Sequence, residues 1–268
     1  MDILKTLKHK IIIFISIFVL FILTALIFVY KDQKIAVLGY HSFISHKNKF
    51  NYQDPMILDI DKFEEQIKYL KNHNYKTLSL EEFYCWKNKK CKIPRKSVLI
   101  TMDDGYLSNY YLAFPILKKY DMKATVFYVG SYINDDNKEW NDDPKEFMSF
   151  EDIENAKKEY PNIEFASHSY DLHKMNDVEN MTYDELVNDI NKYKKINDSK
   201  FFAYPFGNYN DKIESALKNN GYKMAFTFGP KENHRKATLY DNNYRIPRLN
   251  ISDDMSYFKF KLRLILPF

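Results

Sequence analysis

The sequence lacks the features that would point to a disordered or nucleic-acid-binding protein. It has no low-complexity stretch and no repeat at solenoid spacing. Its net charge is only +4, from 40 basic and 36 acidic residues that are interleaved along the chain, which argues against nucleic acid as a partner. Hydrophobic residues make up 45% and aromatic residues 17% of the 268 residues. This composition suits one large domain, or two small ones, with a substantial core.

Cysteine is also scarce, with only Cys85 and Cys91. The two residues lie in a lysine-rich stretch and could close a disulfide if the chain is exported, or remain as two free thiols. The sequence leaves both alternatives open. Neither cysteine has a base beside it in the sequence, so a nucleophilic role is not expected.

The longest stretch without charge lies near the N-terminus, at Ile11–Tyr30. Its twenty residues are enough to cross a bilayer as a helix, whereas the core of a signal peptide is usually shorter. No small-x-small cleavage site follows it. We therefore predict a signal-anchor over residues 1–30, which makes the membrane a partner, and an extracellular catalytic domain over residues 31–268. A cleaved signal peptide, and hence a secreted protein, is the alternative.

Hydrophobic runs and capping residues predict strands that alternate with helices along the rest of the chain. The expected strands are Ile35–Leu38, Val98–Met102, Ala124–Val129, Ile163–Ala166, Phe201–Tyr204, Tyr222–Phe228 and Tyr244–Leu249. The helices are expected to begin at Asp61 (in a capping box with Glu64), Ser79, Pro115, Ser149 and Thr182, with one more around Ile213 and Leu217. This alternation predicts an α/β fold with a mainly parallel sheet. In a parallel α/β barrel, the residues that follow the strands meet at one mouth.

Asp103 and Asp104 follow one of these buried strands. An Asp-Asp-Gly run is usually a simple turn, in which glycine supplies a positive φ. Its position after Val98–Met102 favours a functional role instead. Adjacent residues at a strand end point to different sides, so one carboxylate could bind a metal while the other faces a substrate.

His168 and His173 follow the strand Ile163–Ala166 and are five residues apart. On a helix this spacing would turn them about 140° from each other, so we expect a loop that wraps round an ion. Together with one aspartate they offer three ligands and an open position, which suits a catalytic metal. Asp171 could accept a hydrogen bond from a ligand imidazole. The alternative is one buried and one surface histidine with no shared role.

Two further segments could complete a site. Tyr204, Pro205 and Phe206, followed by Gly207, form a rigid turn whose backbone N–H groups could face an oxyanion, or a turn with only a structural role. Arg245 and Arg248 bracket Pro247 after the last expected strand. Either arginine could steady a catalytic carboxylate, although many surface arginines have no such role.

These motifs resemble those of the polysaccharide deacetylases (NodB-like, carbohydrate esterase family 4). Thr101-Met-Asp-Asp-Gly105 is similar to the family's first motif, and the resemblance covers roughly residues 35 to 250. It implies that Asp103 is the general base and that Asp104, His168 and His173 bind a divalent metal, with Zn²⁺ favoured. It also implies a distorted (β/α) barrel.

The sequence departs from the common family pattern in three ways. Its histidines are five rather than four residues apart, a form similar to the branch that deacetylates poly-β-1,6-N-acetylglucosamine. No histidine follows His234, and Val37-Leu-Gly-Tyr-His41 resembles the permuted order of that branch, which implies His41 as the general acid. The family's third-motif arginine is replaced by Phe202, and Arg248 is our candidate to substitute for it.

We therefore predict a metal-dependent hydrolase that removes acetyl groups from poly-β-1,6-N-acetyl-D-glucosamine, a biofilm adhesin, at the cell surface. The nearest alternative is a deacetylase of peptidoglycan or chitin oligomers. A second alternative is a catalytically silent polysaccharide-binding module, in which Trp140 could stack on sugar rings. A metal-dependent phosphodiesterase would need more carboxylates and a phosphate cradle, and the sequence offers neither.

Overall fold

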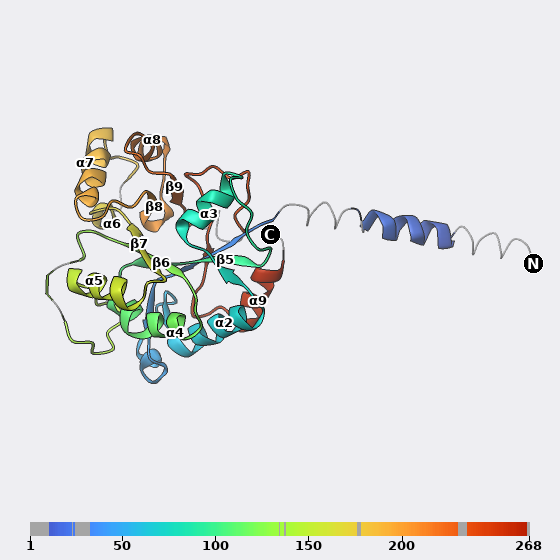
Figure 1. Cartoon of the computed structure of the whole chain (residues 1–268), viewed down its shortest axis with the longest axis horizontal. Helices are drawn as coiled ribbons and strands as arrows, with labels where there is room; N and C mark the ends of the chain where they lie inside the picture. Colours follow the sequence, from blue (N-terminus) through green and yellow to red (C-terminus); the bar gives the residue numbers. More distant parts are fainter. Residues whose placement is uncertain are drawn as a thin grey trace, which may run out of the picture.

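The computed structural model of the chain describes residues 11–22, 24, 33–133, 135–136, 138–175, 178–229 and 235–266. A curled sheet of parallel strands forms its centre, and helices cover the outside (Figure 1). The strands of this sheet are β1 (Ala36–Tyr40), β4 (Lys76–Thr77), β5 (Ser97–Asp104), β6 (Ala124–Tyr128), β7 (Ile163–Ser167), β8 (Phe201–Ala203), β9 (Met224–Phe226) and β10 (Leu249–Asn250). Their order is β10-β1-β5-β6-β7-β8-β9, and β4 pairs with the start of β5. The prediction of a mainly parallel α/β sheet is therefore confirmed.

The helices and the remaining short elements surround this sheet. The α-helices are α2 (Ile60–Asn72), α3 (Leu80–Lys87), α4 (Phe114–Lys119), α5 (Phe150–Glu159), α6 (Leu172–Met175), α7 (Tyr183–Lys194), α8 (Asp211–Asn219) and α9 (Tyr257–Ile265). The globular part also contains two 3₁₀ turns, η1 (His46–Asn51) and η3 (Pro205–Gly207), and a π-helical turn, η2 (Asn109–Ala113). A separate parallel pair joins β2 (Ser42–Ile44) to β3 (Ile57–Asp59). An isolated bridge from Phe226 to Ile246 connects β9 to the segment that leads into β10.

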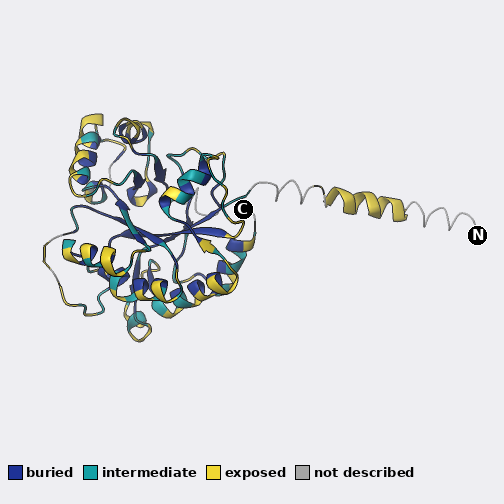
Figure 2. Ribbon diagram, viewed as in Figure 1, coloured by how far each residue is buried: buried dark blue, intermediate teal, exposed yellow. Residues whose placement is uncertain are grey.

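The two faces of the sheet have different cores because side chains alternate along each strand. Val98, Ile100 and Met102 of β5 belong to the outer core, which also contains apolar residues of α2, α4, α5 and α9. Leu99 lies on the opposite, concave face, where it joins side chains from six other segments in a second core: Val37, Phe127, Ala166, Ala203, Phe226 and Ile246. All residues of β5 and β6 are buried, as expected for parallel strands covered on both faces. Figure 2 shows this buried interior with exposed helix surfaces around it.

Several predicted elements are confirmed and two helix starts are wrong. Ser149 and Thr182 cap α5 and α7 through capping boxes, as predicted. In contrast, α2 begins at Ile60, because the side chain of Asp59 accepts the Asp61 N–H and takes the capping role predicted for Asp61.

Pro115 does not begin its helix. The helical path already runs through η2, which leads directly into α4 at Phe114. Proline lacks an N–H and its ring crowds the carbonyl four residues earlier. A π-turn widens the backbone at this point, so the chain can remain helical ahead of a proline.

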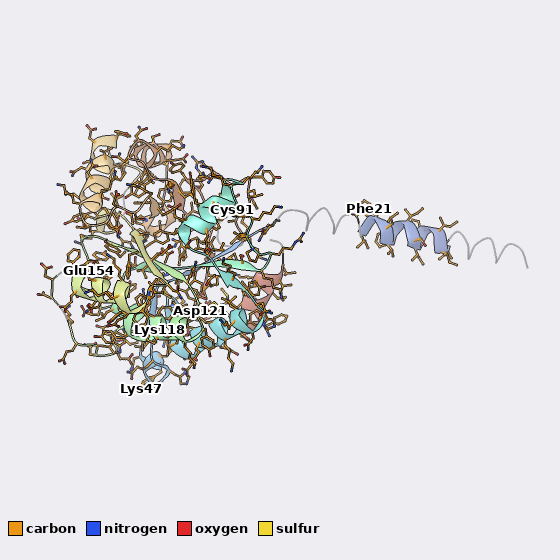
Figure 3. The ribbon with its side chains drawn as sticks, in the orientation of Figure 1. Phe21, Lys47, Cys91, Lys118, Asp121 and Glu154 are labelled. Carbon is orange, nitrogen blue, oxygen red and sulfur yellow. A yellow bond between two sulfur atoms is a disulfide. The ribbon has the colours of Figure 1, made fainter. Side chains whose placement is uncertain are left out.

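Other differences concern the chain after β9 and the N-terminal anchor. The strand predicted at Tyr244–Leu249 is limited to β10 and the bridge at Ile246, and α9 was not predicted. Residues 11–22 are helical with exposed apolar side chains, among them Phe21, which is labelled in Figure 3. Among the described residues, no helix combines the length and apolar character needed to cross a membrane. Much of the predicted anchor, and its boundary at residues 30 and 31, lies outside the described residues.

The two cysteines are joined. Cys85, on α3, forms a disulfide with Cys91, whose position beside this helix is labelled in Figure 3. Of the two alternatives that the sequence left open, the structure therefore contains the disulfide.

Candidate metal and catalytic site

Strand alternation brings four of the candidate side chains to the concave face at one edge of the sheet. Val37, Leu99, Ala166 and Ile246 all belong to the concave core. His41, Asp103, His168 and Arg248 follow these residues at even spacing, beyond the apolar layer. The register of β1 with β5 pairs Tyr40 with Met102, so His41 comes directly after the position opposite Met102. The sheet thus gathers residues that are more than two hundred positions apart in the sequence.

The side chains of Asp104 and His173 join this group although strand alternation does not place them there. Asp104 has a φ of 73°, a left-handed backbone conformation that aspartate tolerates better than most residues. This turn redirects a side chain that simple alternation would place on the outer face. His173 lies on the one-turn helix α6 rather than in the loop that was predicted, whereas His168 does lie in the loop that follows β7.

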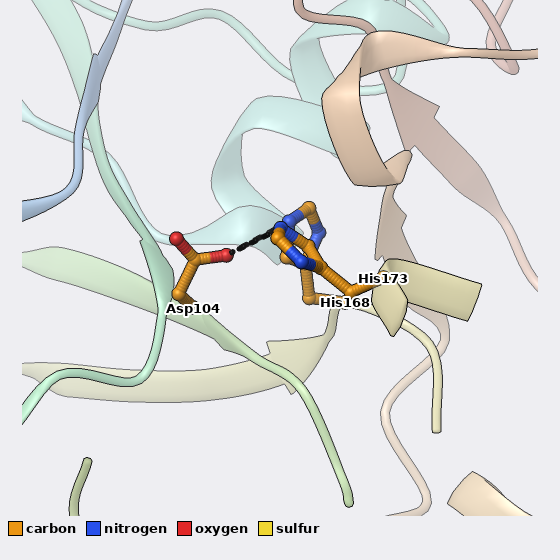
Figure 4. Close-up of side chains that lie close together, drawn as sticks. All are labelled: Asp104, His168 and His173. Atoms are coloured by element: carbon orange, nitrogen blue, oxygen red, sulfur yellow. Dashed lines mark ion pairs between the residues drawn. The ribbon is translucent and has the colours of Figure 1, made fainter. Parts of the chain in front are cut away.

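The predicted ligands Asp104, His168 and His173 lie together (Figure 4). Asp104 Oδ1 is 3.4 Å from His168 Nε2 and 3.1 Å from His173 Nε2, and the three atoms lie within 4.8 Å of one another. Asp104 Oδ1 is also a buried oxygen without a hydrogen-bond partner within the described structure. A carboxylate oxygen and two imidazole nitrogens that converge in this way form a donor set that fits a divalent cation.

The other ring nitrogens of both histidines are held by the protein. His168 Nδ1 lies 2.8 Å from the backbone carbonyl of Ala203, and His173 Nδ1 lies 3.2 Å from the Tyr132 hydroxyl. These contacts direct both Nε2 atoms toward Asp104 and fix the ring orientations. The predicted role of Asp171 as an acceptor for a ligand imidazole is wrong. Its carboxylate instead accepts a hydrogen bond from Ser131 and pairs with Lys174.

Asp103 forms a buried ion pair with Arg248. Both carboxylate oxygens accept hydrogen bonds of 2.7 Å, one from each terminal nitrogen of the guanidinium. Arg248 is fully buried and also donates to the Thr227 carbonyl and to the Thr101 hydroxyl. Bidentate, charge-assisted bonds of this kind fix both the distance and the plane of the carboxylate. Arg245, the other candidate, points elsewhere and pairs with Glu214 and Asp211.

The pKa values of both aspartates are lowered by their surroundings. Burial acts to raise the pKa of Asp103, but the charges of Arg248 and His168 and the bonds from Arg248 hold it below 3.8. Burial also acts to raise the pKa of Asp104, and the imidazoles of His168 and His173 hold it well below that value. Both groups are therefore carboxylates at neutral pH.

His41 lies at the edge of this group. Its ring packs edge-on against Phe228 with the ring centroids 5.1 Å apart. Its Nδ1 atom is buried without a hydrogen-bond partner in the described part of the chain. The electrostatic interaction with His41 helps to lower the pKa of both Asp103 and Asp104.

Of the residues in the predicted oxyanion turn, Tyr204 points into the protein core and Phe206 lies beside the metal ligands. Tyr204 is fully buried, and its ring packs with Phe202 and Tyr209 in a separate core beneath α7 and α8. Its N–H bonds to Phe226, and Gly207 N–H bonds to Tyr204. Since Pro205 has no N–H, Phe206 carries the remaining candidate donor of the turn.

Phe206 has a φ of 56°, which is rare for a bulky residue, and its ring packs 4.4 Å from that of His173. This contact places the turn beside the metal ligands. A strained backbone conformation at such a position is typical of functional sites.

Two features of the site were missed from the sequence. Asp189 on α7 is buried, and its two oxygens accept the backbone N–H groups of Tyr170 and Asp171, at 2.9 and 2.7 Å. It thereby anchors the loop between the two ligand histidines. Burial raises the pKa of Asp189 to about 6. No local motif marks this residue, because its partners are backbone groups on another segment.

The second missed feature is a chain of aromatic rings that leads away from His173. Tyr132 packs against both His173 and Phe147, and Phe147 stacks on Tyr106. The only sequence signal was the position of Tyr106 directly after the Asp-Asp-Gly motif. A second group of possible ligands lies away from this site. His46 Nδ1 is 2.5 Å from Oδ2 of Asp59, the N-cap of α2, and Asp61 lies beside them; His46 and Asp61 are exposed.

Comparison with known proteins agrees with this geometry. The chain is 34% identical over 255 residues to the poly-beta-1,6-N-acetyl-D-glucosamine N-deacetylase of Staphylococcus aureus, in an alignment that covers 84% of this chain and 81% of that protein. Its fold is similar to that of the Streptococcus pyogenes deacetylase PplD in complex with acetate (TM-score 0.73, 25% identity, 87% of this chain and 99% of that one). It is also similar to that of IcaB from Ammonifex degensii (TM-score 0.69, 20% identity, 87% and 96%).

The sequence profile of the polysaccharide deacetylases matches residues 90–225. This range contains Asp103, Asp104, His168 and His173, whereas His41 and Arg248 lie outside it. The matched range is about half of the chain, and the staphylococcal relative extends the similarity over most of the remainder. On these grounds the chain belongs to the polysaccharide deacetylase family.

Proposed function

We propose that this protein is a metal-dependent N-deacetylase that removes acetyl groups from poly-β-1,6-N-acetyl-D-glucosamine. The observation that carries the proposal is the convergence of Asp104, His168 and His173 beside the buried Asp103–Arg248 pair. The choice of substrate rests on the staphylococcal relative, whose name specifies this polymer. We take the curled sheet as the distorted (β/α) barrel of the family.

Asp104, His168 and His173 would hold the metal, with Zn²⁺ favoured by the mixed nitrogen and oxygen ligands. A divalent ion at this position supplies Lewis-acid polarisation of the acetyl carbonyl and favours deprotonation of water. The protein contributes ligand geometry, through the bonds of His168 to Ala203 and of His173 to Tyr132. It also contributes burial, which strengthens the electrostatic interactions inside the site.

Asp103 would act as the general base. It is ionised at neutral pH, and Arg248 holds its carboxylate in a fixed plane. In the proposed step it takes a proton from water as the oxygen of that water bonds to the acetyl carbon. The Phe206 N–H would donate a hydrogen bond to the resulting oxyanion.

His41 would act as the general acid. The carbon–nitrogen bond breaks as a protonated His41 gives its proton to the departing amine. The products are acetate and a glucosamine unit, and Asp103 carries the proton taken from water.

Residues 1–30 would anchor the enzyme in the membrane with its catalytic domain outside the cell. The support is the uncharged run Ile11–Tyr30, whose described part is helical and exposes its apolar side chains. A location at the cell surface would place the enzyme where an exported polysaccharide is found. The disulfide between Cys85 and Cys91 agrees with an oxidising compartment.

The proposal is tested by acetate release from acetylated β-1,6-linked glucosamine oligomers, with and without a chelator. We expect release that the chelator abolishes and that Zn²⁺ restores. Asp103→Asn should abolish release while metal still binds. Reaction of β-1,4-linked oligomers alone would instead support the peptidoglycan or chitin alternative, and an inactive protein that binds the polymer would support the silent binding module.

A further inference from the structure

Two complementary polar atoms at the proposed catalytic site are buried without a hydrogen-bond partner among the described residues. One is Nδ1 of His41 and the other is Oδ1 of Asn250. Buried polar atoms in native proteins are nearly always hydrogen-bonded, so each exception calls for an explanation. An imidazole nitrogen can carry a proton and an amide oxygen can accept one in a hydrogen bond, so each atom offers what the other lacks.

Asn250 faces the concave side of the sheet. Its neighbours Leu249 and Ile251 both belong to the outer core, so alternation along β10 turns the side chain between them inward. Arg248 lies two residues earlier on the same face and holds the carboxylate of Asp103. Asn250 therefore occupies the next concave position on the segment that supplies the partner of the proposed base.

The register of β10 with β1 brings Asn250 close to His41. Asn250 pairs with Gly39, and His41 lies two residues further along the same face. With strands about 4.8 Å apart and a rise of about 3.3 Å per residue, the two Cα atoms lie about 8 Å apart along the diagonal. Diagonal neighbours on one face of a sheet are within reach of each other when one of them is a long or aromatic side chain.

The proposed role of His41 creates a need for an acceptor at its buried nitrogen. A histidine that acts as a general acid carries a proton on both ring nitrogens. His41 lines a cavity of about 280 Å³ and its Nδ1 is buried, so Nε2 is the nitrogen left to face a substrate. The Nδ1–H of the charged ring must then be satisfied inside the protein, because a buried donor on a cation is costly to leave unpaired. The neighbouring Phe228 ring, with its centroid 5.1 Å from that of His41, offers no oxygen for this purpose.

We infer that Asn250 is the positioning residue for the general acid His41. When the imidazole is protonated, a rotation of the two side chains lets Nδ1–H donate a hydrogen bond to Asn250 Oδ1. This bond fixes the plane of the ring and directs Nε2–H toward the departing amine. The inference rests on the function proposed above. Two successive concave residues of one segment then support the two proton-transfer groups, Arg248 the base and Asn250 the acid.

Other charged and titratable groups act on His41 from the elements around it. Two of them interact electrostatically with His41, one lies beside the start of β10, and three line the same cavity: Asp103, Asp104, Arg248, Tyr106, Asp54 and Lys145. All of them are unchanged when Asn250 is replaced. A shift that appears only in Asn250 variants therefore reports the proposed hydrogen bond.

The test compares the metal-loaded native protein with Asn250→Leu and Asn250→Asp, which both keep the size of the side chain. Asn250→Leu removes the acceptor, so the pKa of His41 should fall and the alkaline limb of the kcat/KM profile should move to lower pH. Its kcat should fall by about tenfold or more, as expected for one hydrogen bond to a charged group, with KM changed by less than about twofold. Asn250→Asp adds a negative charge and should move the alkaline limb to higher pH by about one unit.

An NMR titration of labelled histidine gives the pKa of His41 without turnover. Asn243→Asp is the matched control, because it adds the same charge at a half-buried asparagine that bonds to Asn88 outside this cavity. It should leave both the pKa and the alkaline limb unchanged. The same pKa of His41 in the native protein, Asn250→Leu and Asn250→Asp would overturn the pairing, as would a loss of activity confined to KM. If the native protein released no acetate from any oligomer, the proposed function would fall, while the NMR comparison would still decide the pairing.

Discussion

Replacing Arg248 by methionine should strongly destabilise the fold, because it leaves Asp103 as a buried carboxylate without its partner. The side chain keeps a similar length but loses two bonds of 2.7 Å to Asp103 and one of 3.0 Å to Thr227. Breaking a buried ion pair from one side typically costs about 3–5 kcal/mol. A domain of ordinary stability has about 5–15 kcal/mol in total, so the loss should be plain in urea unfolding.

Arg245→Met is the matched control for this experiment. Arg245 also makes two ion pairs, but with two separate carboxylates; its side chain is 38% exposed and Asp211 is 95% exposed. Its other partner, Glu214, is 6% exposed but keeps hydrogen bonds from Lys218 and Asn242 when Arg245 is replaced. Surface pairs contribute about 0–1 kcal/mol, so this variant should unfold close to the native protein. Asp103→Asn combined with Arg248→Met should cost less than the sum of the single changes, because no unpaired charge remains.

The effect of Arg248→Met should also depend on pH. Asp103 has a folded pKa below 3.8, so the pair stabilises the fold above that pH and loses its contribution as pH falls through the folded pKa. Without the guanidinium, only the charges of His168 and His41 oppose the effect of burial, so the pKa of the carboxyl rises. The two proteins should therefore differ most near neutral pH and converge in acid. A loss below about 1 kcal/mol at neutral pH, equal to that of Arg245→Met, would refute this reasoning.

Four further predictions concern the backbone, the ligand loop, pH and the disulfide. Gly207→Ala should lower the free energy of unfolding by more than about 3 kcal/mol, measured by thermal unfolding, because the added Cβ would lie 1.7 Å from the Phe228 carbonyl oxygen. Gly221→Ala is the control: this glycine is also at positive φ but in open space, so the loss should be about 1 kcal/mol. Equal losses in the two variants would contradict the steric argument. Asp189→Asn leaves one loop N–H without an acceptor and should weaken Zn²⁺ binding about 10–100-fold in a competition titration, with the exposed Asp184→Asn on the same helix unchanged. Burial acts to lower the pKa of His168, but the charges of Asp103 and Asp104 raise it above 6.5 overall. Because a ligand imidazole must be neutral, the affinity for Zn²⁺ should increase as pH rises through that raised pKa. An affinity that does not change with pH would count against His168 as a ligand. Reduction of Cys85–Cys91, six residues apart, should lower the unfolding free energy by about 2 kcal/mol, and an unchanged urea midpoint would exclude a stabilising role.

The sequence was most informative where chemistry and local pattern coincide. Buried strands, the capping boxes at Ser149 and Thr182, and the positions of Asp103 and His168 after strands could all be predicted, because each depends on near neighbours in the chain. The pairing of Arg248 rather than Arg245 with Asp103 could not be derived from the residues. Both arginines bracket the same proline, and only the alternation of the concave face, two residues beyond Ile246, distinguishes them.

Other features depend on contacts that no local pattern carries. Asp189 acts through backbone groups of a loop about twenty residues away, and Asp104 reaches the ligand group through a left-handed turn that a strand pattern does not reveal. The helix start at Asp61 was misassigned because Asp59, inside a hydrophobic segment, competes for the same cap. The chain of aromatic rings that leads away from His173 depends on the bridge between Tyr106 and Phe147, which are forty-one residues apart.

The long sequence separation within the Asp103–Arg248 pair has a consequence for biosynthesis. The arginine emerges from the ribosome 145 residues after the carboxylate that it clamps. A nascent chain that already contains Asp103, Asp104 and both ligand histidines still lacks the Arg248 guanidinium that pairs with Asp103. Such a chain lacks the guanidinium that fixes the proposed base, so we expect no deacetylation before the last strand has been synthesised.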